Sequence, residues 1–290
     1  MSNEPIRLVK LDLLMQRSSG VSDVVIGLID GPVAMDHPDL AASKIHMSGG
    51  AAGACTMTES FACQHGTFVA GILSARRGSS APAICPGCTL LLRTIFPESN
   101  ATNGDMPGAT PLELASAIRE TVQAGARVIN LSAALFQPTS AGVQKLQEAL
   151  DFAAARGAIT VVAAGNQGTL GSSAITRHPW VIPVAGCDLN GRPLSESNFG
   201  SSIGRRGLRA PAEAISSLGS DGHPRSFGGT SAAAPFVTGT IALLWSEFPS
   251  ATAAQIKSAV LYAGGMRRNT VVPPLLDAAG AYEVISAARA

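Results

Sequence analysis

The feature that most constrains the fold of this chain is a series of short apolar runs, each of strand length, separated by segments with a helical pattern. The runs lie at 24–29, 90–95, 128–131, 159–164 and 181–184. Runs this short and this apolar are typical of strands buried on both faces of a parallel sheet. Helical patterns occupy 65–75, 111–124 and 141–156. This alternation predicts an α/β fold, a three-layer sandwich with a mostly parallel central sheet and helices on both faces.

Local signals support the helix boundaries. Thr110 is a capping residue, and Pro111 behind it suits the first position of a helix. Gly125 and Gly157 stand just past two helix ends, where glycine commonly ends a helix. Two more helices are expected near 252–262 and 277–288.

Composition excludes some classes of partner. The formal net charge is +1, from 21 Lys and Arg against 20 Asp and Glu, whereas a nucleic-acid surface needs clustered basic residues. The longest apolar runs, such as 241–245, fall far short of the ~20 residues that cross a bilayer. The polar N-terminus does not resemble a secretory signal. We therefore expect a cytoplasmic protein with neither a nucleic-acid nor a membrane partner.

The cysteines leave three interpretations open. There are five of them, Cys55, Cys63, Cys85, Cys88 and Cys187. Cys85 and Cys88 form a Cys-x-x-Cys pair, but a strand follows it where a redox motif would open a helix. A zinc site that adds Cys55 and Cys63 has an unusual spacing in its first pair. Reduced thiols are favoured, then local disulfides (Cys55 with Cys63, Cys85 with Cys88), then a metal site.

One serine is placed as a nucleophile would be. The segment 229–235, Gly-Thr-Ser-Ala-Ala-Ala-Pro, puts Ser231 at the start of an apolar helix. Backbone N–H groups are unpaired there and the helix dipole favours negative charge. An oxyanion formed on a substrate carbonyl would be stabilised by the backbone N–H of Ser231 itself. Ser231 is therefore a candidate nucleophile.

Three further side chains suit the same chemistry. Asp30 ends the first apolar run, His65 opens an apolar helix among small residues, and Asn166 follows the run at 159–164. Alone, each has an ordinary alternative, because Asp and Asn are common in turns and most histidines are structural. Together they supply an orienting carboxylate, a base and an oxyanion donor for Ser231.

The order of these four residues resembles that of the subtilisin-like serine peptidases, peptidase family S8. The matching motifs are Asp-Gly at 30–31, His-Gly-Thr at 65–67, Ala-Ala-Gly-Asn at 163–166 and Gly-Thr-Ser-Ala-Ala-Ala-Pro at 229–235. The resemblance runs over roughly residues 22 to 285. It implies a subtilisin-like sandwich and a serine endopeptidase, with one domain at 1–290, an N-terminal extension at 1–20 and a catalytic core at about 22–285.

The resemblance also implies a role for each residue. Ser231 attacks the scissile carbonyl, His65 takes its proton and returns it to the leaving amine, and Asp30 orients His65. Asn166 and the Ser231 N–H bind the oxyanion. No cofactor is implied, and the partner is a peptide or protein substrate.

The substrate cleft follows from the same resemblance. Ser132, Ala133 and Ala134 would pair with the substrate backbone as an added strand. Asn103 and Gly104 would form the other side of the cleft, and Gly165 would lie beside the oxyanion site.

The chain departs from the family pattern at three places. Gly31 stands where the family usually has Ser or Thr, whose hydroxyl helps hold the aspartate. Ala134 replaces a usual glycine and would narrow the first specificity pocket. The segment 76–80, after the histidine helix, has no carboxylate for calcium, so we expect no metal site there.

The segments 28–33 and 37–40 resemble those of proteases that mature ribosomally made peptides, including the leader-removing cyanobactin type. The short stretch 52–64 has little room for the helical insertion of macrocyclising relatives, which favours hydrolysis. The sequence before residue 24 is too short for a pro-segment, as expected of a cytoplasmic processing enzyme or a mature fragment. Two alternatives stay open: a catalytically silent peptide-binding protein, and a transpeptidase or macrocyclase with the same triad.

Overall fold

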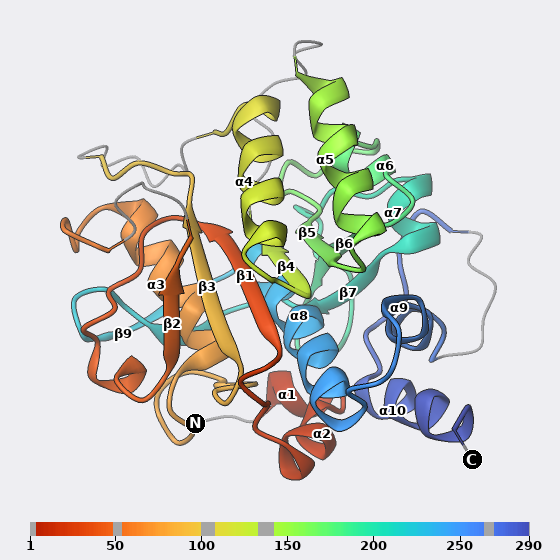
Figure 1. Cartoon of the computed structure of the whole chain (residues 1–290), viewed down its shortest axis with the longest axis horizontal. Helices are drawn as coiled ribbons and strands as arrows, with labels where there is room; N and C mark the ends of the chain where they lie inside the picture. The colour runs from red at the N-terminus through yellow and green to blue at the C-terminus, as the bar shows by residue number, and fades with distance from the viewer. Residues whose placement is uncertain (1–3, 49–53, 100–107, 133–141, 264–269, 290) are drawn as a thin grey trace.

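The computed structural model describes residues 4–48, 54–99, 108–132, 142–263 and 270–289. Its centre is a seven-stranded sheet in which every pairing is parallel (Figure 1). In spatial order the strands are β2 (Lys44–Met47), β3 (Thr89–Thr94), β1 (Val25–Asp30), β4 (Val128–Leu131), β5 (Ile159–Ala163), β6 (Ile182–Cys187) and β7 (Leu208–Pro211). Strands β8 (Ile215–Leu218) and β9 (Pro224–Phe227) form a separate antiparallel ribbon.

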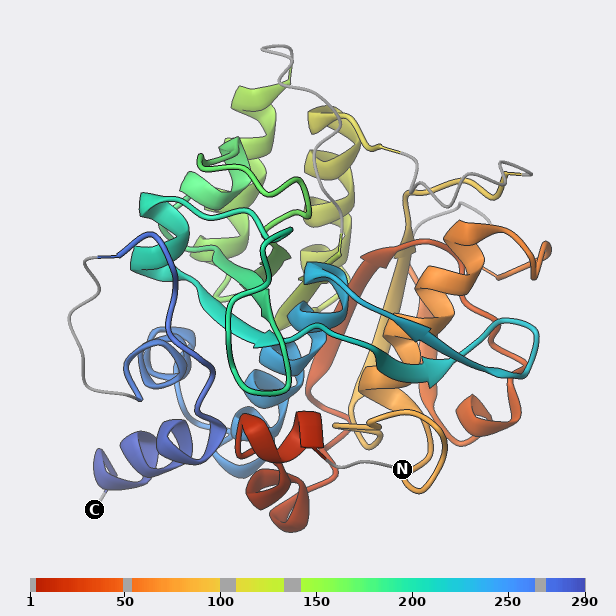
Figure 2. The same ribbon diagram turned by 180° about the vertical axis from the view of Figure 1, so that it is seen from behind.

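Helices cover both faces of the sheet, as the alternation of strands and helices predicts. On one face α4 (Pro111–Gln123) and α5 (Val143–Ala155) bury Ile29 and Leu131 in one apolar cluster. On the other face α3 (Phe61–Ser74) and α8 (Thr230–Glu247) share a larger cluster with Leu28. Figures 1 and 2 show these layers from opposite sides. Neighbouring residues of β1 therefore enter different cores, which explains why its sequence is apolar up to Asp30.

The remaining helices are short or lie at the chain ends. They are α1 (Glu4–Leu8), α2 (Leu11–Arg17), η1 (Pro38–Leu40), α6 (Ala174–Arg177), α7 (Ser201–Arg206), α9 (Ala253–Tyr262) and α10 (Ala278–Ala287). Leu11 and Leu14 of α2 are buried in the same cluster as α8. The N-terminal extension is thus packed against the body of the protein. In the part of the chain that the structure describes, no helix has the length and apolarity to cross a membrane.

The predicted start and end are confirmed for α4, and the predicted end is confirmed for α5, which begins at Val143. Thr110 accepts a hydrogen bond from the Glu113 N–H, and the Glu113 side chain accepts one from the Thr110 N–H in return. Gly125 (φ 96°) and Gly157 (φ 70°) adopt the left-handed conformation just past the two helices. The helix that carries His65 differs from expectation, because it begins at Phe61 and leaves His65 in its second turn.

The cysteines divide between two of the interpretations. Cys55 and Cys63 form a disulfide with 5.5 Å between their Cα atoms, so the favoured interpretation of reduced thiols is wrong for this pair. Cys85, Cys88 and Cys187 are buried free thiols. A hydrogen bond with Cys88, together with burial, raises the pKa of the Cys85 thiol well above its ordinary value. The neighbouring Cys85 thiol in turn lowers the pKa of Cys88.

An arginine just past α3 joins the end of α2 to the segment before β3. The Arg77 guanidinium donates to the carbonyl oxygens of Met15 at 2.5 Å, Ser18 at 2.8 Å and Ile84 at 3.1 Å. Burial lowers the pKa of Arg77 from its usual value, although the group stays charged at neutral pH. Arg77 lies in the carboxylate-free segment at which a calcium site is not expected, and that expectation stays a prediction.

We expect Arg77→Ala to lower the free energy of unfolding by about 2–3 kcal/mol, because it leaves buried carbonyl oxygens without donors. Arg76→Ala is the matched control, since Arg76 pairs with Asp39 at 2.8 Å and its side chain is 65% exposed. That change should cost less than about 1 kcal/mol. Urea unfolding of the three proteins measures the difference, and equal losses would contradict the role given to Arg77.

Candidate active site

The predicted acid and base contact one another in a buried position. Asp30 is the last residue of β1 and is fully buried, and His65 on α3 is 6% exposed. His65 Nδ1 lies 2.7 Å from Asp30 Oδ1. Because an ionised carboxylate only accepts hydrogen bonds, Nδ1 is the nitrogen that carries the proton. The free nitrogen of the neutral imidazole is then Nε2, which can accept a proton from a nucleophile.

Two glycines allow this contact. A methyl group on Gly31 would overlap the carbonyl oxygen of Ala62 in α3, and one on Gly66 would overlap the carbonyl oxygens of Pro32 and Gly31. The backbone of α3 therefore lies directly against the backbone that follows β1. This packing places His65 beside Asp30 and leaves no room for the Ser or Thr that the family usually has at position 31.

The departure at Gly31 has a visible effect on Asp30. Its Oδ1 accepts from both His65 Nδ1 and the Gly31 N–H, each at 2.7 Å. Its Oδ2 is buried and has no hydrogen-bond partner among the described residues. The support for Asp30 is thus concentrated on one oxygen, as expected when the usual hydroxyl is missing.

Ser231 is the second residue of α8 and is partly exposed. Its Oγ donates to the carbonyl oxygen of Ser132 at 3.1 Å, just past the end of β4. Among the described residues, its hydroxyl makes no hydrogen bond to His65. The hydroxyl therefore points toward the predicted substrate-pairing edge.

Asn166 is held by the residue that precedes Ser231. Its Oδ1 accepts from the Thr230 N–H at 2.8 Å and from Thr230 Oγ1 at 3.0 Å. The Gly165 N–H donates to the same hydroxyl at 3.1 Å. The oxygen of Asn166 is thus occupied, whereas its amide N–H groups have no acceptor within the described part of the chain, and the residue is exposed. Thr230 is a positioning residue that the sequence reasoning missed, although it lies inside the Gly-Thr-Ser motif.

The backbone conformation at position 165 requires glycine. Its φ is 102°, in the left-handed region that favours glycine. A side chain there would also overlap Asn198 Nδ2. Gly165 thus sets the turn between β5 and Asn166.

A buried polar chain fixes Ser132. Thr238 Oγ1 on α8 donates to Asn130 Oδ1 at 2.9 Å, and Asn130 Nδ2 donates to Ser132 Oγ at 2.8 Å. All three side chains are buried. The chain links the helix of Ser231 to the end of β4, and its sequence signal is the polar Asn130 inside an otherwise apolar strand.

The described site residues gather at the side of the sheet where the carboxyl ends of its strands lie. They come from the carboxyl ends of β1, β4 and β5 and from helices α3 and α8 (Figure 2). In open parallel sheets, ligands bind on this side. The other predicted cleft residues, Ala133, Ala134, Asn103 and Gly104, lie outside the described residues.

Comparison with known proteins agrees with this geometry. The Subtilase family model matches residues 21–271. Subtilisin DY from Bacillus licheniformis is 30% identical over 261 residues, which cover 87% of this chain and 88% of that protein. The chain spans 63% of the length of several other Bacillus subtilisins that it matches.

Two solved structures are similar as well. The protease domain of PatA, the patellamide maturation protease, is 28% identical, with a TM-score of 0.82 over 93% of this chain and 97% of that one. The prenylagaramide maturation protease PagA has a TM-score of 0.82 over 95% of this chain and 98% of that one. At 24% identity, PagA shows the fold alone. Fold, motifs and family match agree: this chain belongs to the subtilase family and is a subtilisin-like serine endopeptidase.

Proposed function

We propose that Asp30, His65 and Ser231 are the catalytic triad of this endopeptidase. The observation that carries the proposal is the buried hydrogen bond of 2.7 Å between His65 Nδ1 and Asp30 Oδ1. This bond fixes the imidazole in the tautomer whose Nε2 accepts a proton. It also places a negative charge where it stabilises the imidazolium that forms during catalysis.

The reaction begins with a rotation of the Ser231 side chain. The hydroxyl leaves the Ser132 carbonyl and turns toward His65 Nε2, a change between staggered rotamers. As Oγ forms a bond to the scissile carbonyl carbon, its proton passes to Nε2. The imidazolium then gives that proton to the leaving amine as the peptide bond breaks, and water resolves the acyl-enzyme in the same way.

The developing oxyanion would lie between the Asn166 amide and the Ser231 N–H. Thr230 supports this role, because its two hydrogen bonds hold the Asn166 oxygen and leave the amide N–H groups to donate. A donor held in place before the reaction needs no reorganisation when charge develops. Thr230 is therefore a positioning residue for the oxyanion site.

We propose a peptide segment as substrate, held in an extended form along Ser132, Ala133 and Ala134 as an added strand. Asn103 and Gly104 would close the other side of this cleft, and Gly165 would border the oxyanion site. The buried Thr238–Asn130–Ser132 chain supports the proposal, because its hydrogen bonds fix Ser132, the first residue of this segment.

The natural substrate is proposed to be a ribosomally made precursor peptide whose leader is removed by hydrolysis in the cytoplasm. This proposal rests on the segments 28–33 and 37–40 and on the likeness to PatA, a patellamide maturation protease. Transpeptidation is the second candidate, since an amine can resolve the same acyl-enzyme in place of water. The catalytically silent alternative does not agree with the match to the subtilase family and its subtilisins, so it is not carried further.

A fluorophosphonate probe should label the wild-type chain at Ser231 and should not label Ser231→Ala. The reason is that the probe phosphonylates only a serine activated by a neighbouring base. Intact-mass spectrometry measures the adduct, and peptide mapping locates it. Ser201→Ala is the matched control, because Ser201 is an exposed serine at the start of another helix, α7, and that variant should still be labelled. Folded wild-type protein without an adduct would contradict the triad assignment.

A precursor-like peptide library incubated in heavy-oxygen water should yield linear products that carry heavy oxygen at the new carboxyl terminus. Water that resolves the acyl-enzyme must leave its oxygen there, whereas an amine leaves none. Mass spectrometry reads both the cleavage position and the label. Cyclic or ligated products without heavy oxygen would overturn hydrolysis in favour of transpeptidation.

A further inference from the structure

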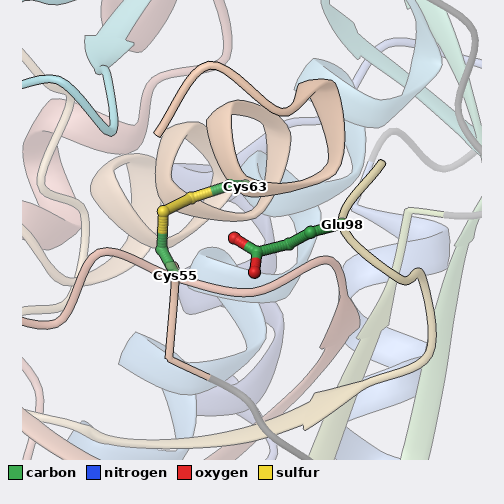
Figure 3. Close-up of side chains that lie close together, drawn as sticks. All are labelled: Cys55, Cys63 and Glu98. Carbon is green, nitrogen blue, oxygen red and sulfur yellow. A yellow bond between two sulfur atoms is a disulfide. The ribbon is translucent and has the colours of Figure 1, made fainter. Parts of the chain in front are cut away.

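Two sulfur atoms and a carboxylate meet beside the helix that carries His65 (Figure 3). One ligand atom each from Cys55, Cys63 and Glu98 lies within 4.8 Å of the other two. Cys63 is fully buried, whereas Cys55 and Glu98 are partly exposed. In this structure the two sulfur atoms are bonded to one another.

Glu98 brings a negative charge to this cluster. Its carboxylate accepts hydrogen bonds from the Thr56 hydroxyl and from the N–H groups of Thr56 and Met57, which hold it in place beside the sulfur atoms. In the part of the chain that the structure describes, no lysine or arginine forms an ion pair with Glu98. Among the described residues, the carboxylate beside the two sulfur atoms is thus held by hydrogen bonds and not by an ion pair.

Reduction would turn this cluster into a set of metal ligands. A dithiol reductant supplies two electrons and two protons, so the Cys55–Cys63 bond becomes two thiols while the reductant becomes a disulfide. Two cysteines and one carboxylate are donors that zinc prefers, and a water completes four-fold coordination. Binding releases both thiol protons, and the doubly charged cation offsets two of the three negative charges of the two thiolates and the carboxylate. The sulfur atoms need only separate to roughly 3.8 Å, as two Zn–S bonds of about 2.3 Å require.

We propose that Cys55, Cys63 and Glu98 form a zinc site in the reduced protein, so that this region is cross-linked by a disulfide under oxidising conditions and by the cation under reducing ones.

The cross-link ties together segments that surround the acid–base pair. Cys63 lies two residues before His65 in α3. The Cys55 N–H donates to the Val33 carbonyl at 3.1 Å, close behind Asp30. Glu98 follows β3, which pairs with β1 as far as Asp30. Either form of the link would therefore hold α3 against the end of β1. This consequence rests on the proposed function, whereas the metal site itself does not.

The test uses the full chain, reduced with a phosphine and freed of reductant without oxygen. Zinc is titrated against a coloured chelator, and cobalt is used as a spectroscopic substitute. We expect one metal per chain and a thiolate-to-cobalt charge-transfer band. Affinity should fall at least about 100-fold in Cys63→Ala and about tenfold or more in Glu98→Gln, which keeps an oxygen for the Thr56 and Met57 N–H groups.

The control variants separate this site from the other thiols. Thr56→Val keeps all three ligands and should bind zinc within about threefold of wild type. Cys85→Ala/Cys88→Ala should retain binding, because these buried thiols belong to a different turn. Circular dichroism checks the fold of each variant, and Glu98→Gln remains decisive if Cys63→Ala does not fold.

Three results would overturn the proposal. The first is a zinc affinity of the wild-type chain that is no higher than that of Glu98→Gln. The second is a loss of zinc binding in Cys85→Ala/Cys88→Ala. The third is a Cys55–Cys63 bond that alkylation and mass spectrometry show to be intact after treatment with the reductant. None of these measurements depends on proteolysis. The proposal of a metal site and the proposal of a catalytic triad are therefore tested independently.

Discussion

The direct packing of α3 on the backbone that follows β1 is the constraint on which the site depends. Side chains at Gly31 and Gly66 would overlap main-chain oxygen atoms across this contact. The close approach brings His65 Nδ1 to 2.7 Å from Asp30 Oδ1, with Asp30 fully buried and His65 6% exposed. In such a place a charged carboxylate is costly unless it is hydrogen-bonded, so the imidazole and the Gly31 N–H each contribute to keeping it there.

The rest of the site is arranged around α8. Its first residues supply Ser231 and Thr230, and Thr238 two turns later reaches Asn130 in β4. One buried helix thus positions the candidate nucleophile Ser231, the proposed oxyanion donor Asn166 and the start of the proposed substrate-binding segment. Because α8 is buried along nearly its whole length, a change in its packing would be felt at all three.

Much of this arrangement is readable from the sequence, for physical reasons. Strands buried on both faces, such as β1, need apolar residues at every position, and their carboxyl ends must meet at one edge. Strand β2 was missed because it lies at the sheet edge, and its residues Lys44 and His46 break the apolar pattern. The start of α3 was missed although Ser60 is of a residue type that commonly precedes a helix; among the described residues its side chain makes no capping hydrogen bond.

The positioning residues were harder to predict. Thr230, Asn130 and Thr238 act through contacts between segments up to 108 residues apart, which no local pattern encodes. The Cys55–Cys63 disulfide likewise depends on how the loop before α3 folds back. Local sequence motifs therefore indicate the candidate catalytic residues more readily than the residues that hold them in place.

The central claim is that Asp30 holds His65 by a hydrogen bond from Nδ1. The most direct measurement is the proton NMR spectrum of protein with nitrogen-labelled histidine. The account predicts a strongly deshielded Nδ1 proton assigned to His65, which is lost in Asp30→Ala and kept in Ser231→Ala. A wild-type spectrum without this proton, or one unchanged by Asp30→Ala, would contradict it.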